Sequence, residues 1–445
     1  MARSISRTRA VRRVAATTIS TTALLLPAAA WAQCSASGAN NATVSCSGTA
    51  TSYTYTGTAP ANITVNSGAT VTAPLTATVA GSTLTNVGTV ANTASAGGIV
   101  LGNNATVTNG TVTNGTVTTG TITSAGTASG ATAITVGANS TVTNNGTLTA
   151  TAGTPAVNFT GVNGTFVNSR FANAAVQGNI QYGANSGASI GTFINNNTAF
   201  GITGSVAGSG NLAVTNNGIF TGNILQSSIT GSTVTVNNGS AGTFAGIINT
   251  GDVSNISNAG TMTLYGTTSL NSVIGSAQAG ASTLTNTGTL AIGNQSSPTQ
   301  VTVFGNFSQS SAGTLAISIA SAGASLPIAG ASYSQLYASD AGATLATAGN
   351  VALAGKLVVN VAAGFYPTNS VYNLILADKT ITGTFSSVTT STLVTTPPPT
   401  ARACRPRSPP RTRWPSSPSR TAMWCRWPMA SRPTRRSRPI SNTPT

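Results

Sequence analysis

The 445-residue chain contains no histidine and no glutamate, and its acidic residues are Asp252, Asp340 and Asp378. Acid–base and nucleophilic catalysis need a titrating partner within hydrogen-bond reach of the reacting group, so a Ser-His-acid triad is excluded within one chain. Glycoside cleavage by paired carboxylates needs two aspartates side by side, whereas we expect all three to be solvated surface residues. No catalytic residue, and therefore no enzyme, is predicted.

Metal ligands and cofactor motifs are equally scarce. Two cysteines near the N-terminus, no histidine and no acidic repeat predict no metal site. Glycine-rich strings such as "GSVAGSGN" lack the strand-to-helix context and the lysine of a phosphate-binding loop. We therefore expect no cofactor.

Charged residues make up 5% of the chain, yet the formal net charge is +16. Sixteen of the 19 basic residues lie at the two ends, five before residue 14 and eleven from Arg402 to Arg438. Between residues 33 and 400, three cations balance the three aspartates. A basic excess promotes binding to nucleic acid only when it gathers on one folded surface. We therefore predict no nucleic-acid partner.

The first 32 residues, "MARSISRTRAVRRVAATTISTTALLLPAAAWA", have the order of a secretory signal. A basic start precedes an apolar stretch around Leu24–Leu26, and Ala30-Trp31-Ala32 is a small-x-small cleavage site. We predict Sec-dependent export and cleavage between Ala32 and Gln33. The alternative, a membrane-spanning helix, needs about 20 consecutive apolar residues, and threonines and serines interrupt this stretch.

Cys34 and Cys46 follow the signal with eleven residues between them. In an oxidising compartment they are candidates for a disulfide, which would stabilise the fold by roughly 2 to 3 kcal/mol. The alternative is that both are small unpaired residues.

Internal repetition is the strongest signal in the chain. An Asn-x-Gly triplet recurs, preceded by an aliphatic residue two places before the Asn and followed by an apolar residue two places after the Gly. The step from Gly218 to Gly239 and from Gly239 to Gly260 is 21 residues, and the next step is 28. The triplets are Asn86–Gly88, Asn144–Gly146, Asn216–Gly218, Asn237–Gly239, Asn258–Gly260 and Asn286–Gly288.

Around each triplet, apolar residues alternate with threonine or serine, the period of a half-buried strand. Asn and Gly tolerate positive φ, so each unit reads as strand, corner, strand. The corners could close antiparallel hairpins, but a coil with roughly 20 residues per turn explains the regular spacing better. We predict an all-β, right-handed parallel β-helix, with stacked asparagines forming hydrogen-bonded ladders and a narrow interior of Val, Ile, Leu and Ala with few aromatics.

The stretch "ATVTNGTVTNGTVTTGTITSAGT", residues 105–127, repeats more tightly, with apolar residues five apart. This odd spacing does not keep one face of a flat strand. We expect short strands broken by glycines. A flexible Thr/Gly linker is the alternative.

Residues 299–395 carry denser apolar residues and most of the later aromatics. In order, their segments resemble the end of a bacterial autotransporter (type V secretion) passenger, the autochaperone region. The matching segments are Gly305–Phe307, Gly313–Leu315, Tyr333–Leu336, Leu353–Val361, Gly364–Pro367, Tyr372–Leu374 and Gly383–Phe385. The resemblance implies a β-helix passenger over 33–298, a β-rich cap over 299–395 that closes one end and templates folding, and an outer-membrane barrel translocator as partner.

The tail, residues 396–445, holds 12 of the 19 prolines and eleven arginines. Prolines at this density oppose helices and strands, so we expect the tail to be disordered. A minimal barrel needs about eight alternating strands, and this segment shows no such pattern. We hypothesise that the tail is an out-of-frame reading of a GC-rich gene, which the other two frames would reveal. The alternative is a basic, tryptophan-bearing arm that binds anionic surfaces.

Together these observations predict a secreted or cell-surface β-solenoid, associated with the cell outer membrane where a barrel is present, that serves as an adhesin or structural display rod. Its expected partners are the barrel translocator and a host surface or glycan. The alternative is a secreted β-helix polysaccharide hydrolase or lyase. A third interpretation is a flat threonine array that orders water or ice. The two-partner exoproteins, which are also β-helical, are disfavoured because no export-domain motif follows the signal.

Overall fold

The computed structural model describes residues 33–392, apart from 39–41, 73, 94–96, 127–130, 152, 172, 268–269, 278–279, 322–325, 365 and 367–369, together with the backbone of 405–407 and 421–426. The expected signal, including Ala32, and most of the tail lie outside these residues. Gln33 is the first residue described.

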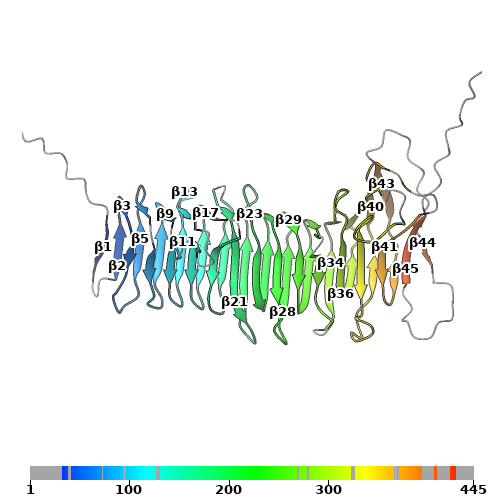
Figure 1. The fold of residues 1–445 in the computed structure, drawn as a ribbon, viewed down its shortest axis with the longest axis horizontal. Helices are drawn as coiled ribbons and strands as arrows, with labels where there is room; N and C mark the ends of the chain where they lie inside the picture. The colour runs from blue at the N-terminus through cyan, green and yellow to red at the C-terminus, as the bar shows by residue number, and fades with distance from the viewer. Residues whose placement is uncertain are drawn as a thin grey trace, which may run out of the picture. The chain divides into compact units, whose positions relative to one another are not determined.

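Every regular element in this part of the chain is a β-strand. None of the described residues belongs to a helix that could cross a membrane. Successive strands enter three parallel sheets in rotation, so that each turn of the chain adds one strand to sheet A, one to sheet B and one to sheet C. Figure 1 shows these strands side by side in chain order, from blue at the N-terminal end to orange.

Sheet A follows the corner asparagines. Its strands are β2 (Thr43–Cys46), β5 (Asn62–Val65), β8 (Thr83–Asn86), β11 (Thr106–Asn109), β16 (Thr141–Asn144), β19 (Thr165–Asn168), β22 (Gly191–Asn195), β25 (Leu212–Asn216), β28 (Thr233–Asn238), β31 (Val253–Asn258), β34 (Ser282–Asn286), the second half of β36 (Gln300–Gln309), β39 (Val351–Leu353) and β42 (Ile381–Gly383).

Sheet B comes next in each turn and contains 14 strands. They are β3 (Thr49–Ala50), β6 (Thr70–Val71), β9 (Thr89–Asn92), β14 (Thr121–Ser124), β17 (Thr147–Ala150), β20 (Ala175–Gln177), β23 (Ile202–Thr203), β26 (Ile219–Thr221), β29 (Thr243–Gly246), β32 (Thr261–Leu264), β35 (Thr289–Ile292), β37 (Thr314–Ile319), β40 (Lys356–Val361) and β43 (Ser387–Thr392).

Sheet C completes each turn. Its parallel strands are β4 (Tyr53–Thr54), β7 (Leu75–Ala77), β10 (Ile99–Leu101), β15 (Ile134–Val136), β18 (Pro155–Phe159), β21 (Asn179–Asn185), β24 (Val206–Gly210), β27 (Ile224–Ser227), β30 (Ile248–Thr250), β33 (Val273–Ile274), the first half of β36, β38 (Gln335–Ser339) and β41 (Val371–Ala377).

Like residues lie over like residues in the strand register. The Thr-Val-Thr-Asn of β11 pairs residue for residue with the Thr-Leu-Thr-Asn of β8 and the Thr-Val-Thr-Asn of β16. A one-residue slip would turn the buried Val107 and Val142 outward, so the hydrophobic pattern fixes the register. The prediction of a parallel β-helix is confirmed.

The interior differs from the expected aliphatic strip. Val, Ile and Leu fill the first turns, but buried aromatics stack in the middle ones, beginning with Phe159 on Tyr182 at 5.0 Å between ring centroids. A second column joins Phe166, Phe193, Phe220 and Phe244 at 5.2 to 5.8 Å. Offset and edge-on rings at such distances attract one another beyond their area burial, so stacking like on like applies to aromatics too.

Residues 300–392 continue the same coil. β36 pairs with β34 of sheet A through Gly305–Gln309 and with β38 of sheet C through Gln300–Phe304, so one long strand bends between two sheets. β37, β40 and β43 extend sheet B in unbroken register. The region expected to be a cap therefore templates on the last asparagine-bearing turn through direct strand pairing.

The tightly repeating stretch forms a side hairpin. β12 (Thr111–Thr113) pairs antiparallel with β13 (Thr116–Thr118), while the strands on either side, β11 and β14, stay in sheets A and B. Asn114 and Gly115 between them have φ values of 51° and 80°, the positive values that a two-residue hairpin turn requires. The hairpin geometry that we rejected for the whole chain thus occurs once, as an insertion.

The tail differs in part from the expectation of disorder. β44 (Arg405–Arg407) and β45 (Thr421–Arg426) are strands, and β45 pairs antiparallel with β41 at the end of sheet C. An open sheet edge presents unpaired N–H and C=O groups. Residues 419–427 are the longest proline-free stretch of the tail, and this is the stretch able to pair with that edge.

Candidate functional site

The corner asparagines form one continuous ladder of side-chain hydrogen bonds. Each Nδ2 donates to the Oδ1 of the next turn at 2.7 to 3.0 Å, and every member is at most 1% exposed. The ladder ends at Gln309, whose Oε1 accepts from Asn286 at 3.1 Å. Its members are Asn86, Asn109, Asn144, Asn168, Asn195, Asn216, Asn238, Asn258, Asn286 and Gln309.

The ladder satisfies backbone carbonyls as well as side chains. Asn216 Nδ2 also donates to the Thr243 carbonyl at 3.1 Å, and Asn258 Nδ2 to that of Thr289 at 2.8 Å. A buried amide without partners costs several kcal/mol, whereas here each carboxamide uses both its donor and its acceptor. The ladder closes the corner between sheets A and B on successive turns.

One expected corner is wrong by one residue. Asn238 occupies the ladder and pairs in register with Asn258, while Asn237 is exposed. The strand period of two places alternate residues on opposite faces, so adjacent asparagines cannot both point inward. Asn86, Asn144, Asn216, Asn258 and Asn286 lie in the ladder.

Sequence reasoning missed Asn109, Asn168 and Asn195. None of these has a glycine two places later, because the turns after them take other paths. All three follow a buried apolar residue by two positions, at Val107, Phe166 and Phe193. An apolar-x-Asn pattern would have found them.

The corner glycines are required by close stacking. The glycines of the six triplets do not have positive φ, contrary to the expected reason for them. A Cβ on Gly146 would lie 2.1 Å from the Gly120 carbonyl oxygen, and one on Gly288 would lie 2.2 Å from that of Gly260. The turns therefore approach so closely at this corner that no side chain fits.

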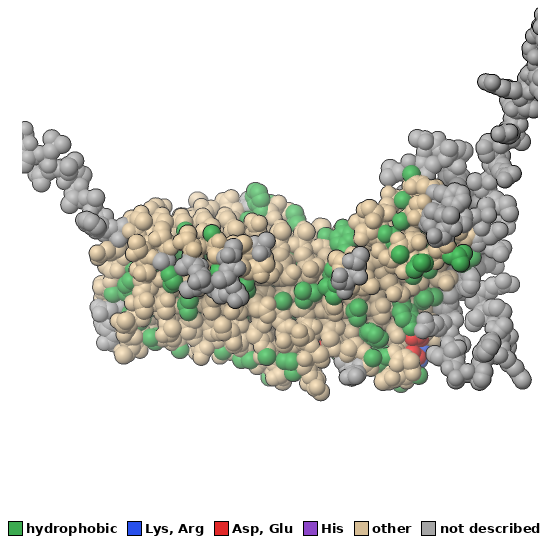
Figure 2. Space-filling view, viewed as in Figure 1, with side chains coloured by type: hydrophobic (Ala, Val, Ile, Leu, Met, Phe, Trp, Pro, Cys, Tyr) green, Lys and Arg blue, Asp and Glu red, His purple; other side chains and the backbone are tan. Residues whose placement is uncertain are grey.

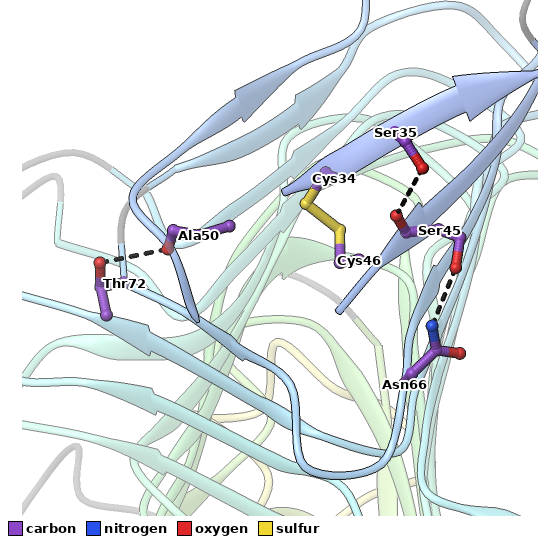
Figure 3. The surroundings of a disulfide bond; sticks show 7 residues. All are labelled: Cys34, Ser35, Ser45, Cys46, Ala50, Asn66 and Thr72. Atoms are coloured by element: carbon purple, nitrogen blue, oxygen red, sulfur yellow. Dashed lines mark hydrogen bonds between the residues drawn. A yellow bond between two sulfur atoms is a disulfide. The ribbon is translucent and has the colours of Figure 1, made fainter. Parts of the chain in front are cut away.

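A disulfide joins Cys34 and Cys46 at the N-terminal end of the coil. β1 (Cys34–Ser37) pairs antiparallel with β2, and the two cysteines face each other in this pairing. Asn66 of the next turn donates to the Ser45 hydroxyl at 2.8 Å, which ties the disulfide-linked pair to the coil (Figure 3). β1 covers the edge that sheet A would otherwise expose.

The three aspartates are buried, contrary to the expectation of solvated surface residues. Asp252 is 1% exposed and accepts hydrogen bonds from Gln226 Nε2 at 2.7 Å, Ser228 Oγ at 2.8 Å and Ile229 N at 3.0 Å. Buried carboxylates persist where donors surround them. Asp252 thereby fixes the loop after β27 against the loop after β30.

Asp340 and Asp378 lie together in the C-terminal turns, although 38 residues separate them. Asp378 accepts from Tyr337 Oη at 2.8 Å, Ser339 Oγ at 3.0 Å and Asp340 N at 3.1 Å. Asp340 Oδ1 accepts from Ala343 N at 2.9 Å, and this hydrogen bond holds the pKa of Asp340 below its ordinary value. The carboxylates are 3% and 6% exposed, so both face into this network.

No group of three or more metal-ligating side chains occurs among the described residues. Figure 2 shows a face covered mainly by side chains that are neither charged nor hydrophobic, with acidic colour at the C-terminal end. This surface reflects the threonines, serines and asparagines that alternate with the buried residues of each strand.

No protein-family model matches the chain, and no curated protein is significantly similar to it.

Proposed function

We propose that this chain is an exported passenger of the autotransporter type, working at or beyond the cell surface as an adhesin or structural display module. The observation that carries the proposal is the unbroken coil, in which 14 strands of sheet B stack in register under a nearly neutral polar surface. Such a solenoid gives an extended binding surface built from nearest-neighbour contacts. The signal pattern and the resemblance of residues 299–395 support export and a barrel translocator as partner.

The runner-up, a polysaccharide hydrolase or lyase, gains one observation from the fold: Asp340 and Asp378 are neighbours. General acid–base catalysis needs carboxyl groups that can reach a substrate. These two carboxylates are at most 6% exposed and accept hydrogen bonds from Tyr337, Ser339 and backbone amides. A structural role of the pair, holding loop 340–349 in place, fits this geometry better.

A water-ordering threonine array is supported by three consecutive turns of sheet A. Thr83 and Thr85, Thr106 and Thr108, and Thr141 and Thr143 stack in register on the outer face. The next turns place Val167 and Ile194 in one of the two columns, which ends the array. Thermal hysteresis of the purified chain tests this second candidate.

Surface display tests the main proposal. Residues 1–396 would be joined to a translocating barrel and expressed in a Gram-negative host, with the barrel alone as control. We expect export, removal of the chain from intact cells by added protease, and increased adherence of the cells. Retention in the periplasm, or release of sugar from polysaccharide by the purified chain, would contradict the proposal.

A further inference from the structure

A depression of about 350 Å³ lies on the outer face of sheet C, across β21, β24, β27 and β30. Outward-facing residues stack there in one column, because Gln181 pairs with Ala207, Ala207 with Leu225, and Leu225 with Asn249. The small side chain of Ala207 leaves a hollow between larger neighbours. At about 4.8 Å per strand, the column from Gln181 to Asn249 spans about 14 Å.

The backbone deepens this hollow. β21 carries an irregularity between Gln181 and Ala184, where two residues oppose the single Gly208 of β24. Such a bulge bends its strand locally. Gly208 has no side chain, and Ser209 adds a small one, so the floor stays low over two columns.

The floor is held rigidly from behind. Gln226 lines the depression and is 5% exposed. Its Nε2 donates to Asp252 Oδ2 and to the Gly210 carbonyl, both at 2.7 Å, and its Oε1 accepts from Gly251 N at 3.1 Å. A surface fixed before binding loses little entropy when a ligand arrives.

The lining chemistry selects a neutral, hydroxyl-rich ligand. None of the described residues that line the depression is charged, so it offers nothing to attract an anionic polymer. Gln181 and Asn249 each present a carboxamide with donors and an acceptor, Ser209 and Ser227 add hydroxyls, and Leu225 offers an apolar patch. The site lies on a sheet face and not at an edge, so an extended peptide has no free strand to pair with.

We infer that this depression binds a short segment of a neutral glycan, with the carboxamides of Gln181 and Asn249 hydrogen-bonding sugar hydroxyls and Leu225 contacting a C–H face. The inference deepens the proposed adhesive function and rests on it. Ala207→Trp fills the hollow from the outer face, where it does not disturb the core. Val100→Trp is the matched control, because Val100 lies outside the depression in the same outward column of sheet C.

The test is a glycan array probed with the full exported chain, carrying neutral oligosaccharides of glucose, galactose, mannose and N-acetylglucosamine beside their sialylated and sulfated forms. We expect a neutral glycan to be bound, with affinity reduced at least tenfold in Ala207→Trp and about tenfold in Gln181→Ala or Asn249→Ala, the change that one lost hydrogen bond produces. Val100→Trp should bind like the original chain.

Binding only to anionic glycans, unchanged binding by Ala207→Trp, or no binding to any neutral glycan would overturn the inference. Circular dichroism of each variant checks that the coil is intact. Failure of the proposed function is distinguishable: a chain that reaches the cell surface and promotes adherence, yet binds no neutral glycan, refutes this site alone.

Discussion

The asparagine-bearing turns, residues 43–292, and the C-terminal turns, residues 300–392, use one coil but hold their corners differently. In the first region a neutral carboxamide ladder repeats from turn to turn. In the second the ladder stops at Gln309, and buried aspartates hold a longer loop. A repeated neutral ladder lets turns be added without accumulating charge, whereas an end needs contacts that occur once.

The largest expected effect comes from removing the C-terminal turns. Deleting residues 299–445 exposes the edges of β34 and β35 together with Leu284, Leu290 and Ile292, which are 0% exposed. We expect residues 33–298 to become protease-sensitive, as measured by limited proteolysis. Deleting only 396–445 is the control and should leave resistance unchanged. Full resistance of residues 33–298 would contradict an end-closing role for the C-terminal turns.

The next effect breaks the ladder within the first region. Asn238→Ala leaves the Asn258 Oδ1 without its 2.7 Å donor and the Asn216 Nδ2 without its 2.8 Å acceptor. We expect a loss of about 3 kcal/mol in unfolding free energy, the cost of two unsatisfied buried groups. Asn237→Ala is the matched control and should cost less than about 0.5 kcal/mol because Asn237 is exposed. Equal losses in chemical denaturation would place the wrong asparagine in the ladder.

The N-terminal disulfide gives a smaller, local effect. Replacing Cys34 and Cys46 together with alanine should lower stability by about 2 to 3 kcal/mol in the first turns through the freed chain entropy of the unfolded state. Hydrogen exchange resolved by segment measures this change. Reductant should reproduce it in the original chain and do nothing to the double variant. A loss spread evenly over the whole coil would argue against a local capping role.

The smallest effect separates the two regions by pH. The folded-state pKa of Asp340 is lowered mainly by the Ala343 N–H, so its stabilisation is present above its ordinary pKa of about 3.9 and is lost as pH falls through the lower, folded value. Pepsin digestion between about pH 4 and pH 2 should cut the C-terminal turns first. Asp340→Asn should flatten that dependence, and cleavage beginning instead among the ladder turns would refute the distinction.

Sequence patterns predicted the coil because each strand obeys the same alternation, and they predicted part of the ladder because some corners need both asparagine and glycine. They failed where turn length varies: ladder neighbours are 20 residues apart from Asn238 to Asn258 but 35 apart from Asn109 to Asn144, where the hairpin is inserted. The same variation hid the approach of Asp340 to Asp378. The depression on sheet C was missed because it depends on small residues on adjacent turns, which no single strand reveals.

Register-specific cross-linking tests the stacked coil most directly. Asn237 and Ser257 are outward-facing partners on β28 and β31, whereas Asn255 lies two residues out of register. With Cys404 and Cys425 changed to serine, the pair Asn237→Cys and Ser257→Cys should form a disulfide readily. Asn237→Cys with Asn255→Cys should not, because its Cα atoms are about 8 Å apart. Equal or preferred cross-linking of the slipped pair would contradict the account.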